Sequence, residues 1–283
     1  MPTVRFIPRL DIKGPNLVKG IHLEGLRVLG KPELFSEFYY QNGADELLYI
    51  DVVASLYGRN SLLNMIQKIS KKIFIPLTVG GGIRSIEDIQ SVLKSGADKV
   101  AINTAAIHNP HLIKEASNKF GASTIVVSIA AKKQINGTYE AYTDNGREKT
   151  GVDVFEWANK VEQLGAGEIL LTSIDMEGTG QGYDVELTKK ISTSVSIPVI
   201  ACGGAGNASH VLDVIKEGKA DAVSVASMLH YDFIQNHYSE EDYSAEGNVE
   251  FLKNIRKNSK VERATITDIK KYLVDNHIPC RID

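Results

Sequence analysis

The hydrophobic residues of this chain fall into eight short runs, each rich in Val, Ile and Leu and each followed by a stretch with helical periodicity. The runs lack the apolar–polar alternation of a half-exposed strand, which is typical of strands buried on both faces of a parallel sheet. The first intervening helix is predicted to begin near Pro32 and to end at Gly43, and the last is predicted over about 267–276. The predicted strands span 4–11, 46–52, 74–79, 99–103, 124–130, 168–173, 198–202 and 221–226.

The chain also carries an internal repeat. Residues 75–106 and 197–228 each consist of a strand, a Gly-rich turn, a helix and a second strand that ends in a hydroxyl residue. Residues 42–51 repeat as 164–173 in the same way, and this alignment places Glu46 on Glu168. Eight strand–helix units in two matching sets predict an α/β fold, namely a (β/α)8 TIM barrel made of two duplicated half-barrels. A doubly wound open sheet is the alternative, but it would leave the duplication unexplained.

A third and looser match, between residues 5–14 and 125–134, places Asp11 opposite Ala130.

Two segments interrupt the repeating pattern. Residues 133–150 carry two Asn-Gly pairs and are predicted to form a β-hairpin, and residues 231–264 form an insertion that is first acidic and then basic. Both leave from the carboxyl ends of strands, which is the active-site face of such a barrel. We expect residues 1–283 to form a single domain.

Composition narrows the function classes. The net charge of −3 gives no general attraction to nucleic acid or to an anionic membrane. Cys202 and Cys280 are the only cysteines, and no signal peptide or membrane-length apolar run is present, so we expect a cytoplasmic protein. The histidines show no metal-ligand spacing, and the sequence indicates no metal and no cofactor.

Two Gly-rich turns indicate anion sites. Backbone N–H groups without obstructing side chains can hold a phosphate, and a hydroxyl at the end of the next strand can donate to the same anion. Tight turn geometry alone is the alternative explanation, but two copies with matching hydroxyls favour phosphate binding. Two such sites imply a substrate with a phosphate at each end. The residues are Gly81, Gly82 and Thr104 in one copy and Gly203, Gly204 and Ser227 in the other.

Three carboxylates follow strands at the same face, namely Asp11, Asp51 and Asp175. A carboxylate in this position of a barrel is more often catalytic than structural. Asp11 could instead pair with a nearby lysine such as Lys19, and Asp51 could tether a loop.

Four charged residues begin strands and would meet at the opposite face. Because charged groups are rarely buried unless they are paired, two cations and two carboxylates could close a ring across the bottom of the barrel. The ring could be a structural plug or a gate for a small molecule, and the sequence pattern does not decide between them. Its members are Arg5, Glu46, Lys99 and Glu168.

These residues occur in motifs that resemble the cyclase subunit of imidazole glycerol phosphate synthase, a lyase and glutamine amidotransferase system of histidine biosynthesis. The motifs are LDIKG, LVKG, DELLYID, TVGGGI, GADKVAINTAA, GAGEILLTSID, GYD and CGGAG. The resemblance implies a duplicated barrel that takes ammonia from a glutaminase docked on its N-terminal face. It also implies a bis-phosphorylated ribulosyl nucleotide substrate, with imidazole glycerol phosphate and aminoimidazole carboxamide ribotide as products.

The resemblance further implies roles for particular residues. Asp11 matches the first catalytic aspartate and Lys19 the lysine of a mobile loop, while Asp51 and Asp175 match further family positions. The four charged residues match the family's ammonia gate with their charges kept, which favours the gate over the plug. The expected phosphate-binding residues are Gly81, Gly82, Asn103, Thr104, Gly178, Gly203, Gly204 and Ser227.

Departures from the family pattern change the expected reaction. Ala130 replaces the second catalytic aspartate, and losing a positioned acid typically costs about 10²–10⁴-fold in rate. Arg9 stands where a small residue is usual and should point into the barrel beside Asp11. These changes resemble a paralogue that supplies ammonia for surface-sugar amidation, with a separate amidotransferase as a third protein. An active cyclase and a non-catalytic activator of the glutaminase are the alternatives.

Overall fold

The computed structural model describes residues 3–54, 62–236 and 261–282. Its central feature is a closed parallel barrel, because β10 pairs with both β11 and β7 and so completes the circle. This confirms the predicted (β/α)8 TIM barrel. In order around the barrel the strands are β1 (Arg5–Lys13), β4 (Leu47–Asp51), β5 (Leu77–Gly80), β6 (Lys99–Ile102), β7 (Ile125–Lys133), β10 (Glu168–Ser173), β11 (Val199–Cys202) and β12 (Ala222–Val225).

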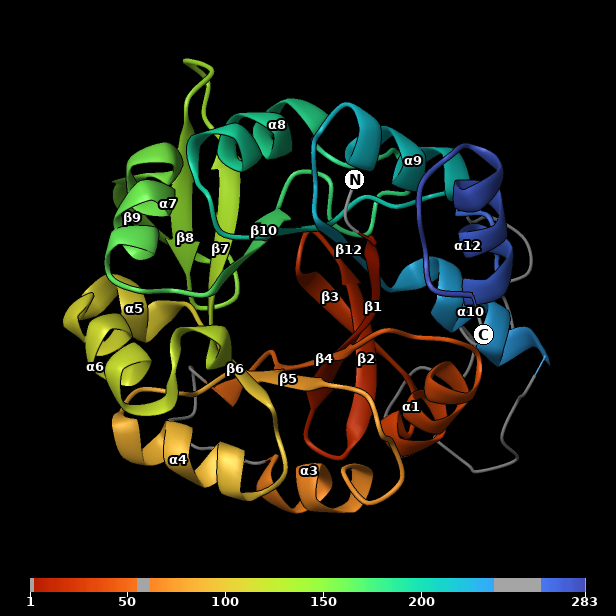
Figure 1. The fold of residues 1–283 in the computed structure, drawn as a ribbon, viewed down its shortest axis with the longest axis horizontal. Coiled ribbons are helices and arrows are strands. Elements are labelled where there is room, and N and C mark those ends of the chain that lie inside the picture. Colours follow the sequence, from red (N-terminus) through yellow and green to blue (C-terminus); the bar gives the residue numbers. More distant parts are fainter. Residues whose placement is uncertain (1–2, 55–61, 237–260, 283) are drawn as a thin grey trace.

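Helices surround the barrel, as Figure 1 shows. Side-chain caps fix where several of them begin. Ser85 and Asp88 form a capping box at one helix, and Thr265 and Asp268 form another. The helices are α1 (Pro32–Gln41), α3 (Leu63–Ile69), α4 (Ile86–Lys94), α5 (Thr104–His108), α6 (His111–Phe120), α7 (Val154–Gln163), α8 (Val185–Ser194), α9 (Ala208–Lys216), α10 (Ser227–Asn236) and α12 (Ile266–Asp275), with a 3₁₀ turn, η1 (Ala122–Thr124).

Strand register supports the duplication. Asp11 of β1 lies opposite Ile50 of β4, and Ala130 of β7 lies opposite Thr172 of β10. The repeat that aligns residues 42–51 with 164–173 also aligns Ile50 with Thr172. Asp11 and Ala130 therefore occupy equivalent places in the two half-barrels.

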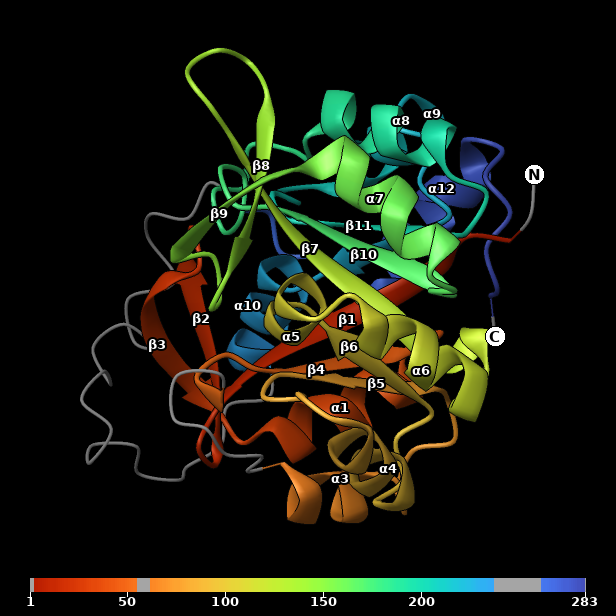
Figure 2. The same cartoon turned by 90° about the vertical axis from the view of Figure 1, so that its left-hand side faces the viewer.

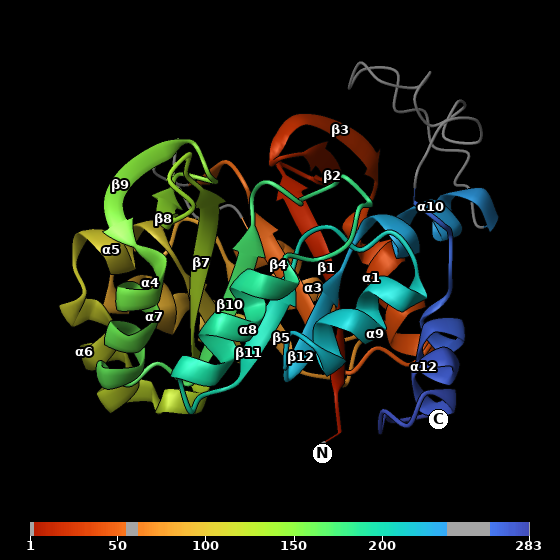
Figure 3. The same ribbon diagram turned by 90° about the horizontal axis from the view of Figure 1, so that it is seen from above.

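Each half-barrel begins with a strand that runs on into an antiparallel hairpin. β1 continues into β2 (Asn16–Ile21) and β3 (Glu24–Gly30), and β7 continues into β8 (Tyr139–Thr143) and β9 (Glu148–Asp153). Figures 2 and 3 show both hairpins at one end of the barrel, opposite the end at which the N-terminus lies. The predicted strands did not include β2 and β3, because their turn uses His22 and Leu23 at positive φ rather than an Asn-Gly pair.

The core has two parts. Most buried apolar residues lie between the strands and the helices, and a smaller cluster fills the barrel itself. In the described part of the chain, no helix is both long and apolar enough to cross a bilayer. Of the expected insertion at 231–264, residues 237–260 lie outside the described residues. The barrel cluster consists of Ile7, Leu48, Ala101, Val126, Leu170, Ile200, Cys202 and Ala222.

Candidate functional site

The four charged residues at the strand starts form a closed ring of ion pairs. Arg5 Nη1 lies 3.0 Å from carboxylate oxygens of both Glu46 and Glu168. Lys99 Nζ lies 3.0 Å from Glu46 Oε2 and 3.2 Å from Glu168 Oε1. Burial alone would lower the pKa of Arg5, but the two carboxylates outweigh burial and raise that pKa above its usual value. Arg5 therefore stays charged at neutral pH.

One layer of apolar side chains separates this ring from the mouth of the barrel. Because interior side chains recur at every second residue of a strand, Lys99 is followed inward by Ala101 and Glu168 by Leu170. Two residues span about 7 Å of strand. Ala101 and Leu170 also line the floor of a cavity at the mouth of the barrel, which is the larger of the two cavities described below. The ring thus lies one side-chain layer below that cavity.

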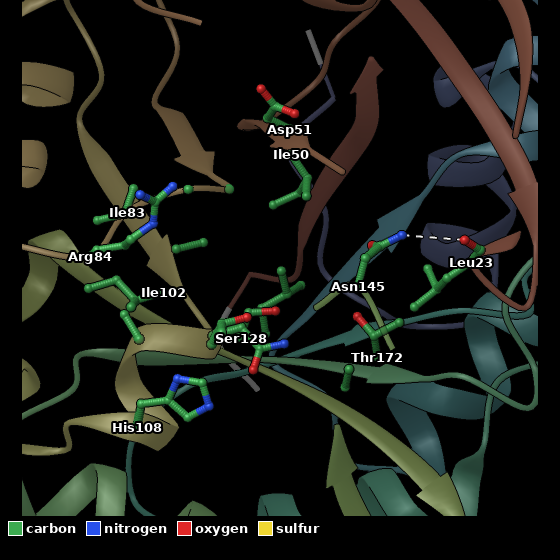
Figure 4. A pocket seen from close by; sticks show the side chains of 18 of the residues that line it. Leu23, Ile50, Asp51, Ile83, Arg84, Ile102, His108, Ser128, Asn145 and Thr172 are labelled. Carbon is green, nitrogen blue, oxygen red and sulfur yellow. Dashed lines mark hydrogen bonds between the residues drawn. The ribbon is translucent and has the colours of Figure 1, made fainter. Parts of the chain in front are cut away.

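The larger cavity, of about 310 Å³, belongs mainly to the first half-barrel. Figure 4 shows Arg84 and His108 on one side of it, Asn145 and Thr172 on the other, and Asp51 beside Ile50. A volume of this size is in the range of small-molecule sites, which begin at about 300 Å³. The expected site residues among those that line it are Asp51, Gly81, Gly82, Asn103 and Thr104, and Ala130 lines it as well.

The first Gly-rich turn has a backbone conformation that requires glycine, and polar side chains lie next to it. Gly81 has a φ of +98°, and a Cβ at this position would lie 2.3 Å from the carbonyl oxygen of Asp51. The hydroxyl of Thr104 accepts a hydrogen bond from the amide of Asp144 at 3.1 Å, so its own proton can be donated to a ligand. Asn103 donates to the carbonyl of Tyr142, while its Oδ1 is buried and has no hydrogen-bond partner among the described residues.

The second Gly-rich turn borders a much smaller cavity, of about 20 Å³. A cavity of this size has room for about one water molecule. The expected site residues among those that line it are Lys19, Gly178, Gly203, Gly204 and Ser227.

Arg9 lines both cavities and lies between them. Its Nε donates to Asp11 Oδ1 at 2.8 Å, and its Nη1 lies 3.3 Å from Thr172 Oγ1 and 3.2 Å from Cys202 Sγ. Only 4% of Arg9 is exposed. Burial would lower the pKa of its guanidinium, but Asp11 and, more weakly, Cys202 and Glu177 together outweigh burial and hold that pKa well above its usual value. As expected from the sequence, Arg9 points into the barrel beside Asp11. Of the two carboxylates considered as partners, Asp11 and Asp51, it is Asp11 that Arg9 pairs with, so one oxygen of that carboxylate is already bound.

The β2–β3 hairpin closes over the smaller cavity. Lys19 forms a buried ion pair with Glu177, and the backbone amide of His22 donates to the Glu177 carbonyl at 2.8 Å. Burial would raise the pKa of Glu177, but the charges of Lys19 and Arg9 outweigh burial and lower that pKa. Gly178 permits the approach, since a Cβ there would lie 2.5 Å from the carbonyl oxygen of Gly20.

The carboxylate candidates are not all brought together. Asp51 lines the larger cavity, and its Oδ1 accepts from the backbone amide of Val53 at 3.1 Å. Asp11 lies behind Arg9, whereas Asp175 accepts from the backbone amide of Lys133 at 2.8 Å and lines neither cavity. Ala130 packs in a small apolar cluster with Leu23, Tyr142 and Ile174.

Sequence reasoning missed Glu177, Arg84 and His108. Glu177 directly precedes a Gly-rich segment and is fully buried between two cations, yet its partner Lys19 lies 158 residues away. Arg84 and His108 come two and four residues after the expected site residues Gly82 and Thr104, and this proximity was the available signal. Among the described residues, no group of three or more His, Cys, Asp or Glu side chains could hold a metal ion.

A closed parallel barrel with charged residues at the strand starts and Gly-rich turns after the strand ends defines the class of (β/α)8 barrel proteins. The chain matches the family model described as "Histidine biosynthesis protein" over residues 5–235. It is 60% identical to the imidazole glycerol phosphate synthase subunit HisF of Legionella pneumophila over 206 residues, which is 73% of this chain and 97% of that one. The HisF of Methanocaldococcus jannaschii is 44% identical along the whole of both chains. The HisF of Lachnoclostridium phytofermentans is 53% identical over 82% of this chain and 90% of its own.

The chain therefore belongs to the histidine-biosynthesis family that includes the HisF subunits of imidazole glycerol phosphate synthase. The resemblance found in the sequence motifs is confirmed.

Proposed function

We propose that this barrel receives ammonia from a partner glutaminase docked on the face that carries Arg5 and Glu168. The observation that carries the proposal is the closed ion-pair ring one apolar layer below the larger cavity. A charged ring would keep water and ions out of the barrel, and a brief break in one pair would admit a molecule as small as ammonia. In this proposal, the path continues past the small side chain of Ala101 in the layer above.

In this proposal, the reaction at the cavity has diverged toward the amidation of a surface-glycan sugar. A separate amidotransferase uses the ammonia to amidate that sugar. Three features support divergence. Ala130 has no proton to transfer, Arg9 holds an oxygen of Asp11, and the second Gly-rich turn borders a cavity of only about 20 Å³. Each weakens an acid–base reaction on a bis-phosphorylated substrate, while none affects the ring.

The test is capture of the tagged full-length chain from its own cells, followed by an assay of glutamine hydrolysis in the captured fraction. We expect a glutaminase that is more active with the barrel than without it. The Glu168→Gln variant keeps the shape of the side chain but removes its charge. In this variant we expect ammonia use by the barrel to fall more than glutamine hydrolysis does, so that the unused ammonia is released to the solution. Capture without any glutaminase activity would refute the partner, and unchanged coupling in folded Glu168→Gln would refute the gate.

An active cyclase of histidine biosynthesis is the second candidate, and the names of the relatives at 44–60% identity favour it. Rescue of a cyclase-deficient histidine auxotroph by this chain would establish that candidate. Failure to rescue, with the protein shown to be present and folded, would favour the proposal that the reaction of this barrel has diverged. A third candidate, a non-catalytic activator of the glutaminase, predicts no ligand at the larger cavity at all.

A further inference from the structure

The two half-barrels differ at one place on the rim of the barrel end that carries the ion-pair ring. The offset that relates the two repeats places Tyr40 opposite Glu162 and Phe74 opposite Ser196. Helices α1 and α7 have the same length and fit this alignment, and so do β5 and β11. In both halves the first residue lies in the last turn of the helix, and the second lies in the segment before β5 or β11.

In the second half-barrel, this place is closed by hydrogen bonds. The hydroxyl and the backbone amide of Ser196 both donate to Glu162 Oε1, each at 2.6 Å. These bonds tie the segment before β11 to α7, and they lower the pKa of Glu162 below its usual value. Both side chains are polar and keep contact with solvent. A polar pair of this kind is stable at a water-exposed surface without any partner protein.

In the first half-barrel, the same place carries two aromatic side chains. Phe74 is 80% exposed, which makes it the most exposed aromatic side chain in the described part of the chain. Its ring meets that of Tyr40 edge to face, with 6.1 Å between the ring centroids and 62° between the planes. Single exposed apolar residues are common, but an exposed aromatic pair in place of a polar pair is typical of an interface core. Tyr40 and Phe74 therefore form an aromatic patch that the second half lacks.

The aromatic patch lies within reach of a protein that covers the ring. The carbonyl of Pro76 accepts from the amide of Leu47 at 2.9 Å, and Leu47 directly follows Glu46 of the ring. Phe74 is two residues before Pro76, so it lies within about 15 Å of the start of β4. A standard interface covers about 800 Å² on each partner, which is a disc of about 16 Å radius. Figure 3 shows this end of the barrel, opposite the two hairpins.

We propose that Tyr40 and Phe74 anchor the partner glutaminase, so that its main apolar contact falls on the first half-barrel. The partner would present an apolar pocket to Phe74, while the Glu162–Ser196 pair belongs to the polar rim on the other side of the ring. The identity of the partner rests on the proposed function. The inference adds which half of the duplicated barrel carries the anchor and which side chains form it.

The test measures the affinity of the full-length chain for the glutaminase that co-purifies with it, by surface plasmon resonance. Tyr40→Glu combined with Phe74→Ser copies Glu162 and Ser196, a pair that the other half already accommodates at this place. This double variant should bind the glutaminase about thirtyfold more weakly than the wild type, the effect of losing an aromatic hot spot. Its melting temperature should stay close to that of the wild type, because Phe74 is mostly exposed.

Two further variants complete the comparison. Ile135→Ser is the matched control, since Ile135 is fully exposed on the β7–β8 hairpin at the opposite end of the barrel. It should leave the affinity for the glutaminase within about twofold of the wild-type value, as expected for a surface substitution outside the interface. Phe74→Ser alone should weaken binding about tenfold, and it decides the matter if the double variant does not fold.

Wild-type affinity in folded Phe74→Ser, or equal weakening by Ile135→Ser, would overturn the anchor while leaving the glutaminase as partner. Sedimentation velocity gives a further check. If the wild type forms a dimer that the double variant does not form, the patch joins two copies of this chain and the proposal is wrong. A wild-type chain that captures no glutaminase would refute the proposed function together with this occupant, so the two failures give different results.

Discussion

In the first half-barrel, the Gly-rich turn and Thr104 border a cavity of about 310 Å³, whereas the matching turn and Ser227 of the second half border one of about 20 Å³. The strands, their register and the hairpins that extend them are alike in both halves. The difference comes from a few side chains at equivalent places. Arg9 corresponds to Ser128, and Asp11 corresponds to Ala130.

This comparison shows how a duplicated scaffold can keep its geometry while its two sites diverge. Backbone positions such as Gly81 and Gly203 are constrained by close approaches of other backbone, so both halves retain them. Side chains that project into the mouth are free to change without disturbing the barrel. The most informative variants are those that make the two halves more alike or more different.

The largest expected effect comes from placing a carboxylate at position 130, opposite Asp11 in the repeat, and removing the arginine that is bound to Asp11. We expect Ala130→Asp combined with Arg9→Ser to raise the cyclase rate by about 10²–10⁴-fold, with an ammonium salt as nitrogen source. A carboxyl group placed among Leu23, Tyr142 and Ile174 would be desolvated and would stay protonated as an acid. Steady-state turnover of the bis-phosphorylated nucleotide measures the effect.

Ala130→Asn with Arg9→Ser is the matched control, since it has the same shape but no acidic proton. Equal cyclase rates for the Asp and Asn variants would show that an acidic proton at position 130 does not contribute to the rate, contrary to this prediction.

The next largest effect concerns the ion pair that closes the smaller cavity. Glu177→Ala should lower the free energy of unfolding by about 3–5 kcal/mol, because it leaves Lys19 buried without its partner. Denaturant unfolding measures the loss. Glu186→Gln, which removes an exposed partner of Lys190, is the control and should change stability by less than about 1 kcal/mol. Similar small losses for both variants would mean that the pair does not hold the second half closed.

The ion-pair ring differs between the halves at one hydroxyl. Thr78 Oγ1 donates to Glu46 Oε1 at 2.5 Å, whereas Ile200 occupies the equivalent place below Glu168. Thr78→Val should therefore cost about 1.5–3 kcal/mol, the range for a hydrogen bond to a charged group. Ile200→Val is the matched control, which removes one buried methylene without any hydrogen bond and should cost about 0.5–1.5 kcal/mol. If the two losses are equal, Glu46 is not held more firmly than Glu168.

The smallest expected effect is a pH dependence. The pKa of Glu177 is lowered by Lys19 and Arg9, so the unfolded chain binds a proton at this residue more readily than the folded chain. Its contribution to stability is present above the ordinary Glu value of about 4.3 and is lost as the pH falls below it. Unfolding free energies measured between neutral pH and acid should fall more steeply for the wild type than for Glu177→Gln, by at most about 1.4 kcal/mol per pH unit. Parallel curves would contradict the lowered pKa.

Much of the fold followed from the sequence because it depends on local patterns. The eight barrel strands were predicted within a few residues, with β10 matching its predicted range of 168–173. The β2–β3 hairpin escaped prediction because His22 and Leu23 adopt the left-handed conformation without the usual turn residues. The four members of the ring were identified because each begins a strand, and parallel strands in a closed barrel bring their starts together.

The candidate site, like the fold, has features that the sequence predicts and features that only the structure shows. The sequence by itself determined the barrel, its duplication, the Gly-rich turns and the alignment of Asp11 with Ala130, since each follows from spacing and residue type. Only the tertiary structure decided that Arg9 separates two cavities, that Glu177 pairs with Lys19, and that Arg84 joins Thr104 at one of them. The physical reason is that cavity size and charge pairing depend on side chains from distant strands meeting at one point, and no local pattern in the chain records those distances.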